Sequence, residues 1–149
     1  TGGGIALIIG WIQFSGKIRR TRLALHRSIG ITYITAILFG GLAGFYLAMH
    51  ANGGVMNDLG FALLAIAWLG TTFMAYKKAR QQKFEEHKNW MIRSYAVTFA
   101  AVTLRLWMPI LIVGVGLSEV DAYAAVAWLC WVPNIFIGEL IVWRSWVKM

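Results

Sequence analysis

The chain divides into five long apolar runs separated by short polar segments. The runs cover residues 3–15, 28–49, 59–76, 92–116 and 122–143. The apolar residues are continuous within each run, without the strict alternation of a half-buried strand, and four runs have the length of about 17 to 25 residues that a membrane-spanning helix needs. Strands in lipid would leave backbone groups without partners, so the pattern predicts an all-α polytopic transmembrane helix bundle.

The first run is shorter than the others, and the chain begins with it. No basic region precedes the run and no small-residue cleavage site follows it, so we interpret it as part of a membrane helix and not as a signal peptide. We expect further sequence upstream of Thr1. Residues 1–149 are expected to form a single integral membrane domain.

Composition supports a bilayer as the solvent. The chain is 59% hydrophobic and only 13% charged, whereas soluble domains carry about 25% charged residues. A domain of 149 residues cannot bury that much apolar surface in its own core.

The net charge of +8 is unevenly distributed along the chain. Every lysine and arginine except Arg105 falls in the polar segments 17–27, 77–93 and 144–148, whereas the alternate segments carry Asp58, Glu119 and Asp121 without a basic residue. This is the positive-inside pattern, which predicts Thr1 outside and Met149 in the cytoplasm. Basic segments beside anionic headgroups explain the charge without nucleic acid, so we expect the lipid bilayer as the partner.

The fourth run and the residues before it carry a stripe of small and polar side chains. If one helix extends back to His87, the stripe faces other helices and not lipid. Its members are His87, Met91, Ser94, Thr98, Ala101 and Arg105.

The second run has a comparable face. His26, Gly30 and Tyr33 recur at helical spacing, and the face continues to Ile37, to Gly40 or Gly41, and to Gly44. Gly40 with Gly44 also forms a GxxxG pair. Small residues at this spacing allow close approach of another backbone or of a flat ligand, although plain helix packing explains them as well.

Polar residues of the fifth run are candidate partners for the buried arginines. Pro133 is expected to kink the helix. At about 1.5 Å per residue, Asn134 lies level with Arg105, whereas Glu139 lies nearer Arg93 and the cytoplasmic histidines. Because an isolated charge in the membrane is costly, we expect Arg105 to pair with Asn134 and the carbonyls freed by the kink, or with an anionic ligand. A structural clamp and a ligand or proton site both remain open.

Two histidines begin neighbouring apolar segments on the cytoplasmic side. A b-type haem in a helix bundle needs two imidazoles from facing helices, ideally with a glycine that admits the porphyrin edge. His26 and His87, with Gly30 and Tyr33, meet that description. His50 lies alone at the outer end. Three scattered histidines without Cys or Asp at ligand spacing make a poor zinc site.

The sequence contains no recognisable motif for catalysis or nucleotide binding. The chain has no nucleophile elbow, phosphate-binding loop, dinucleotide fingerprint, HExxH or CxxC motif, so the sequence leaves enzyme activity open and favours a protein that is not an enzyme. Its one cysteine, Cys130, lies inside an apolar run and is expected to be a buried thiol.

Six blocks together resemble the bacterial predicted membrane protein family called domain of unknown function 2306. They are GWIQF, HRSIGITY, FGGLAGFYLA, GFALLAIAWLGTT, HKNWMIRSYAVTFAAVTLRLWMP and WLCWVPNIFIGE, in order along nearly the whole chain. The resemblance implies a polytopic helical protein of the bacterial inner membrane and little about activity. Members usually have an upstream helix with its own histidine, a potential partner of His50. The residues in matching blocks are Gln13, His26, Gly30, Tyr33, His87, Trp90, Arg93, Arg105, Trp131, Pro133, Asn134 and Glu139.

Three functions follow from these observations. The glycine faces, the many tryptophans, the short outer loops and the lack of a catalytic motif favour a non-catalytic subunit of a larger membrane complex, such as an energy-transducing one. The second is a haem b electron carrier that uses His26 and His87, which the H-R-x-x-G helix start of di-haem cytochromes b supports only at the level of the fold. The third is a small transporter, or a protein that binds a lipid or a hydrophobic anion or acts on it as an enzyme, with Arg105 and Asn134 as the binding pair.

Overall fold

The structure is a computed structural model that describes residues 2–13, 22–50 and 54–147, with the side chains of 2, 3, 5 and 11–13 excepted. In those ranges every regular element is a helix, which confirms the all-α class. The elements are α1 (Gly2–Gln13), α3 (Leu23–His50), α4 (Val55–Arg80), α5 (Phe84–Thr98), α6 (Ala100–Pro109), a π-helix (Ile110–Gly114), α7 (Glu119–Leu129) and α8 (Val132–Val147).

Four stretches of these helices are long and apolar enough to cross a membrane. They are Leu23–His50, Val55–Arg80, Phe84–Gly114 and Glu119–Val147, and they extend the four full-length runs expected from the sequence. The remaining expected run, 3–15, is the first along the chain and corresponds to α1, and its residues 14 and 15 lie outside the described residues. The chain is therefore a membrane-spanning helical protein, which places it in a lipid bilayer.

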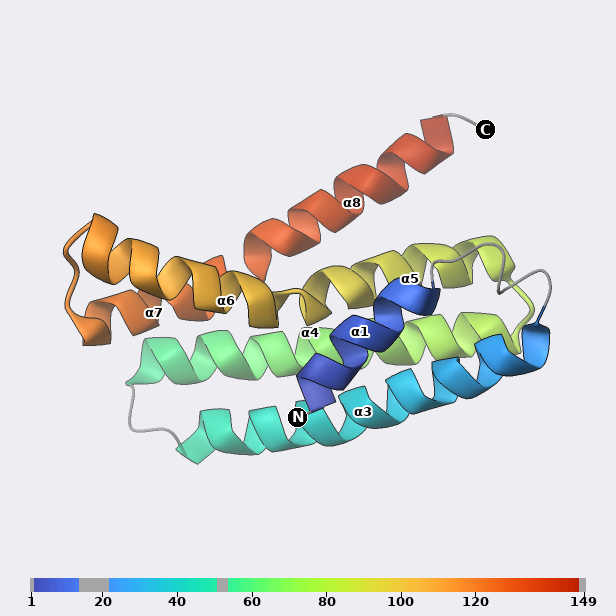
Figure 1. The fold of residues 1–149 in the computed structure, drawn as a ribbon, viewed down its shortest axis with the longest axis horizontal. Helices are drawn as coiled ribbons and strands as arrows, with labels where there is room; N and C mark the ends of the chain where they lie inside the picture. The colour runs from blue at the N-terminus through green and yellow to red at the C-terminus, as the bar shows by residue number, and fades with distance from the viewer. Residues whose placement is uncertain (1, 14–21, 51–53, 148–149) are drawn as a thin grey trace.

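Helix α4 lies at the centre of the bundle. It runs beside α3 for most of its length, packs against α5 along its second half and against α7 near its start, while α1 crosses over α3 and α5 (Figure 1). Helix α8 leaves the bundle at an angle, so that its C-terminus lies apart from the other helices in this view (Figure 1).

Charge is divided between the two ends of the bundle as the sequence predicted. We name the end where α3 and α5 begin and α4 finishes the basic end, and the opposite end the acidic end (Figure 1). Among the described residues the basic end carries Arg22, Arg27, Lys77, Lys78, Arg80, Lys83 and Lys88. The acidic end carries Asp58, Glu119 and Asp121.

The fourth run was expected to be one membrane helix, and it forms one apolar span, Phe84–Gly114, but that span is not uniformly α-helical. The regular helix is interrupted at Phe99, whose ψ of −13° departs from the helical value of about −42°. The carbonyl of Phe99 accepts from the N–H groups of both Val102 and Thr103, which tightens the turn. Further along, Pro109 lacks the N–H that a regular helix uses, and the π-helix Ile110–Gly114 follows it.

The expected kink in the last run is confirmed. Helix α7 ends at Leu129 and α8 begins at Val132, one residue before Pro133. The carbonyl of Cys130 at the break accepts a hydrogen bond from Asn134 Nδ2 (2.9 Å) and another from Thr103 Oγ1. These side chains replace the intrahelical bonding that the break interrupts.

Some glycines allow close helix contacts, but Gly44 of the expected GxxxG pair is not one of them. A Cβ at Gly60 would lie 2.8 Å from Ala127 Cβ, and one at Gly41 would lie 2.7 Å from a methyl group of Leu69. Nothing lies within 4 Å of the corresponding position at Gly44. Gly41, and not Gly44, is therefore the glycine by which α3 approaches α4.

Candidate functional site

A cluster of four buried hydroxyl groups joins α3, α4 and α5 inside the bundle. Tyr33 of α3 is fully buried, and its Oη lies 3.0 Å from both Ser94 Oγ and Thr98 Oγ1 of α5. Thr72 of α4 completes the group, with its Oγ1 2.7 Å from Ser94 Oγ. We call Tyr33, Thr72, Ser94 and Thr98 the hydroxyl cluster.

The hydroxyl cluster is hydrogen-bonded throughout. Trp68 Nε1 donates to Thr98 Oγ1 (2.8 Å). Thr98 and Thr72 donate in turn to the carbonyls of Ser94 and Trp68, each at 2.8 Å. Such a satisfied network in a low-dielectric interior fixes the relative positions of the helices that carry it. The cluster therefore sets the register between α3 and α5.

This register brings two histidines to the same level. Tyr33 follows His26 by seven residues, and Ser94 follows His87 by seven. Seven residues are about two helical turns, or about 10.5 Å, and return a side chain to nearly the same face. Because α3 and α5 both begin at the basic end and Tyr33 touches Ser94, His26 and His87 lie on facing sides of the bundle, two turns nearer that end.

A cavity of about 980 Å³ lies there, between α3, α4 and α5. We call it the histidine cavity, since His26 and His87 both line it, together with the two other residues predicted for a cofactor site, Gly30 and Tyr33. Ligand sites in proteins commonly have volumes of about 300–1,000 Å³. Much of its remaining lining is apolar, and three exposed basic side chains also contribute to it. The apolar residues include Leu23, Ile31, Ile34, Phe84 and Met91, and the basic ones are Arg27, Arg80 and Lys88.

His87 is held in one orientation by its neighbour helix. Its Nδ1 lies 2.8 Å from the backbone oxygen of Ala75 on α4. A carbonyl only accepts, so Nδ1 carries the proton and Nε2 of the neutral ring keeps its lone pair for a ligand. The same arrangement orients imidazoles that bind metals in many proteins.

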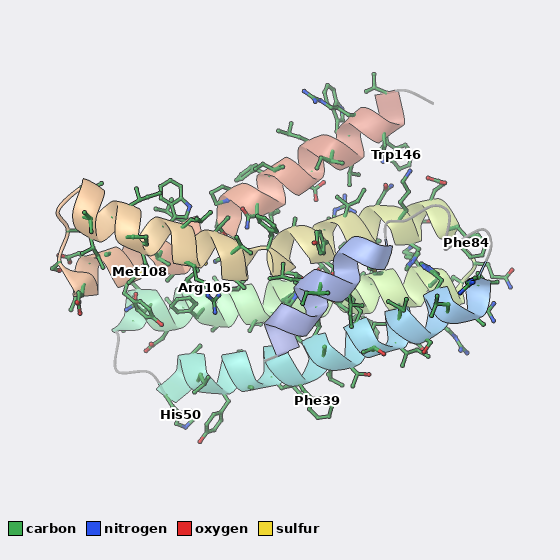
Figure 2. All side chains as sticks on the ribbon, viewed as in Figure 1. Phe39, His50, Phe84, Arg105, Met108 and Trp146 are labelled. Carbon is green, nitrogen blue, oxygen red and sulfur yellow. The ribbon has the colours of Figure 1, made fainter. Side chains whose placement is uncertain are left out.

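The third histidine is placed elsewhere. His50 lies at the acidic end, far from Phe84 and the histidine cavity (Figure 2). Its Nδ1 lies 2.9 Å from the oxygen of Tyr46, and its ring stacks on that tyrosine with centroids 4.2 Å apart. Within residues 2–13, 22–50 and 54–147, no group of three or more His, Cys, Asp or Glu side chains is arranged to hold a metal ion.

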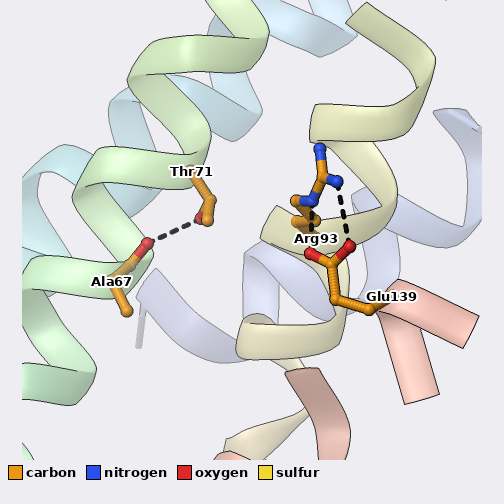
Figure 3. Close-up of polar contacts among 4 residues, drawn as sticks. All are labelled: Ala67, Thr71, Arg93 and Glu139. Atoms are coloured by element: carbon orange, nitrogen blue, oxygen red, sulfur yellow. Dashed lines mark hydrogen bonds and ion pairs between the residues drawn. The ribbon is translucent and has the colours of Figure 1, made fainter. Parts of the chain in front are cut away.

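The predicted proximity of Arg93 and Glu139 is confirmed. Arg93 Nε and Nη2 donate to the two carboxylate oxygens of Glu139 at 2.5 and 2.9 Å, which joins α5 to α8 (Figure 3). The guanidinium carbon also lies 4.6 Å from the centre of the Trp90 ring. Neither Arg93 nor Glu139 lines the histidine cavity.

The predicted pairing of Arg105 with Asn134 was wrong. Arg105 is exposed on α6, and its Nη1 donates to the oxygen of Ala101 on the same helix (2.5 Å); Figure 2 shows it in the half of the bundle farther from Phe84. Asn134 donates instead to Thr103 Oγ1 (3.1 Å) and to the Cys130 oxygen. The interruption at Phe99 is the reason, because it ends the uniform helix on which the predicted stripe depended.

Sequence reasoning missed several residues that the structure brings into these sites. Thr72 and Trp68 of α4 complete the hydroxyl cluster, and Thr103 takes the place predicted for Arg105 beside Asn134. A signal for the cluster was present, since Tyr33 and Ser94 each follow a candidate histidine by the same seven residues. Thr103 had no comparable signal.

Together, the four apolar spans and the polar groups buried among them define a polytopic integral membrane protein. The chain belongs to the predicted membrane protein family DUF2306, whose family model matches residues 1–142. Comparison with curated proteins and with solved structures gave no match.

Proposed function

We propose that this protein binds one haem b in the histidine cavity and acts as an electron carrier of the membrane. One observation carries the proposal: His26 and His87 line the same cavity from different helices and lie at the same level above the hydroxyl cluster. Two imidazoles from facing helices are the ligand set of a bundle-type cytochrome b.

The rest of the cavity suits the same group. Its apolar lining matches a porphyrin ring, and Arg27, Arg80 and Lys88 offer cations to the two propionates. Gly30 lies one turn after His26 and takes little room on that wall. When bound, haem supplies reversible one-electron chemistry. The protein's own contribution is the fixed imidazole of His87, the basic residues and the exclusion of water by apolar walls.

Titration of the purified, haem-free protein with haemin tests this proposal. We expect saturation at one haem per chain with a six-coordinate spectrum, and loss of that spectrum in His26→Ala and His87→Ala. His87→Asn is a second variant, because its amide nitrogen can still donate to Ala75 and preserve the local packing. His50→Ala is the matched control and should bind like the wild type. Unaltered haem binding by folded His26 and His87 variants would overturn the assignment.

The role of an accessory subunit is a second candidate, supported by glycines that the chain itself does not cover. A Cβ at Gly44 on α3 or at Gly70 on α4 would meet nothing within 4 Å. In a bilayer, such small positions let a partner helix approach closely. We expect the protein to form a larger assembly in mild detergent that Gly44→Leu disrupts. A wild-type protein that stays monomeric would count against this candidate.

No observation of this kind supports the third alternative, a transporter or anion-binding protein. A transporter or anion-binding protein that uses Arg105 calls for a cavity that reaches this residue. Arg105 lines neither the histidine cavity nor the smaller cavity described below.

The charge distribution supports an orientation in the bilayer. We propose that the basic end faces the cytoplasm of a bacterial cell, with the acidic end on the outer side of the inner membrane. The histidine cavity then opens near the cytoplasmic surface.

A further inference from the structure

A second cavity lies at the basic end between α5 and α8. Its volume is about 280 Å³, and its lining is Glu86, Asn89, Trp90, Arg93 and Trp146, so it shares no residue with the histidine cavity. It lies where α8 diverges from the bundle, and Figure 2 shows Trp146 near the free end of that helix. We call it the interface cavity.

Asn89 is the least expected residue of the interface cavity. Its side chain is 6% exposed and lines the cavity, yet no residue in the described part of the chain accepts from or donates to its amide. The amide atoms of Asn89 are not among the fully enclosed polar atoms without a partner, so they are open to the cavity that the side chain lines. A ligand in the cavity would supply that partner.

Arg93 presents a further donor in a fixed position. The bidentate contact with Glu139 uses Nε and Nη2 (Figure 3). Together with the Trp90 ring, this contact orients the guanidinium. A guanidinium carries five N–H donors, so those of Nη1 remain after these contacts. Within the described ranges, no protein acceptor engages Nη1. The ion pair therefore positions Arg93 and leaves it able to bind an anion.

The charge around the interface cavity also favours an anion. The carboxylate of Glu86 is engaged by Lys78 Nζ at 2.5 Å and by Lys83 Nζ at 3.3 Å. Glu139 is likewise engaged by Arg93. The charges of the two lining residues, Glu86 and Arg93, balance. When their ion-pair partners Lys78, Lys83 and Glu139 are counted as well, three cations accompany two carboxylates, which leaves one positive charge in excess, the complement of one phosphodiester.

The surroundings are those of a lipid headgroup. Trp90 and Trp146 line the cavity, and tryptophans collect at the level of the headgroups in membrane proteins. Leu140 and Trp143 of α8 are 56% and 63% exposed, so apolar surface for acyl chains continues from the cavity along the helix. A small soluble anion would make no use of that surface.

We propose that the interface cavity binds the phosphodiester of one membrane phospholipid, with Asn89 and Arg93 as hydrogen-bond donors and the two tryptophans beside the headgroup. The site is independent of haem binding, because the two cavities share no lining residue.

Native mass spectrometry of the full chain in detergent, titrated with phosphatidylglycerol, tests the proposal. Diacylglycerol with the same acyl chains is the comparison ligand, since it lacks only the phosphate-bearing headgroup. We expect phosphatidylglycerol to bind at least about tenfold more tightly, as for hydrogen bonds to a charged group. Asn89→Leu, which keeps the volume and removes the donor, should weaken phosphatidylglycerol binding about five- to tenfold and leave diacylglycerol unchanged.

Two further variants keep the result interpretable. Trp146 is 60% exposed near the end of α8, so Trp146→Leu should fold normally and also weaken phosphatidylglycerol binding. Lys77→Gln removes a charge from the same end of the bundle outside both cavities and should bind like the wild type. The proposal is overturned if Asn89→Leu and Trp146→Leu retain wild-type affinity, if diacylglycerol binds as tightly as phosphatidylglycerol, or if inorganic phosphate alone displaces the lipid at equal concentration.

Discussion

The hydroxyl group of Thr98 makes more hydrogen bonds than any other hydroxyl group in the hydroxyl cluster. It accepts from Trp68 Nε1, contacts Tyr33 Oη and donates to the carbonyl of Ser94, so it connects three helices. Ser94 also touches Tyr33 and Thr72, but each of those residues has a second partner. Thr98 and Ser94 lie on the same helix. They differ mainly in that the loss of the Thr98 side chain leaves a donor, Trp68 Nε1, without an acceptor, whereas the loss of the Ser94 side chain does not.

This difference predicts unequal effects of two substitutions. Thr98→Val keeps the shape and leaves the partly buried indole N–H of Trp68 without its acceptor, which should lower the free energy of unfolding by about 1–3 kcal/mol. Ser94→Ala should cost less, about 0.5–1.5 kcal/mol, because Tyr33 retains Thr98 and Thr72 retains the Trp68 carbonyl. Denaturant unfolding in detergent micelles measures both values. Equal losses of unfolding free energy in the two variants would contradict the hydrogen-bond arrangement described for the hydroxyl cluster.

Individual residues also show what the sequence alone could establish. Arg93 and Glu139 were expected near each other from depth along two helices, and their ion pair follows from the cost of a lone charge in lipid. Arg105 was placed by extending one helical face over 18 residues from His87. Small departures from helical geometry accumulate over that length, and the interruption at Phe99 ends the extrapolation.

At the scale of the helix, α4 offers a direct comparison between two glycines. Gly60 faces α7, where an added Cβ would lie 2.8 Å from Ala127 Cβ and 2.9 Å from its backbone oxygen. Gly70 faces open space, with nothing within 4 Å. The same substitution therefore meets a rigid backbone at one position and no atoms at the other.

We expect opposite results from the two alanine substitutions. Gly60→Ala should destabilise the protein by about 1–3 kcal/mol, because a backbone oxygen cannot move aside as a flexible side chain can. Gly70→Ala should be neutral or stabilising by about 0.5–1 kcal/mol, since alanine restricts the unfolded chain and favours helix. Thermal unfolding of both variants, compared with that of the wild type, measures these changes in stability. If Gly60→Ala proves as harmless as Gly70→Ala, then α7 does not pack on α4 at Gly60 as the structure shows.

The sequence predicted how many apolar runs the described residues contain and that these runs are helices. It predicted less well where those helices depart from regular geometry. Length and continuous apolar character indicate helices, and Pro133 indicates a kink. The interruption at Phe99 has no glycine or proline to mark it, and the π-helix after Pro109 depends on how the freed backbone groups find partners. The candidate cavity follows from local spacing: His26, Gly30 and Tyr33 lie within three turns of α3, a length over which helical periodicity is dependable.

For the whole molecule, the division of charge between the two ends relates the fold to the membrane. The histidine cavity and the interface cavity both lie at the basic end, so the proposed orientation places both near the cytoplasm. The sequence predicted this division, because positions along a run of helices alternate between the two faces of a bilayer.

Cysteine labelling in intact cells tests the orientation. A cysteine in place of Val55, which is 72% exposed at the acidic end, should react with a membrane-impermeant maleimide. A cysteine in place of Gln82, exposed at the basic end, should react only after the cells are opened. The native Cys130 is fully buried and gives a low background. The reverse pattern would place the basic end outside.

The most direct measurement is an absorption spectrum of the protein purified from its membrane in mild detergent, recorded oxidised and then reduced with dithionite. We predict a Soret band with sharp α and β bands on reduction, absent in His26→Ala and His87→Ala and retained in His50→Ala. This result would establish His26 and His87 as the two ligands of a bound haem. A folded protein, purified from cells supplied with haem, that shows no visible band would contradict the central claim, and the histidine cavity would then need another ligand.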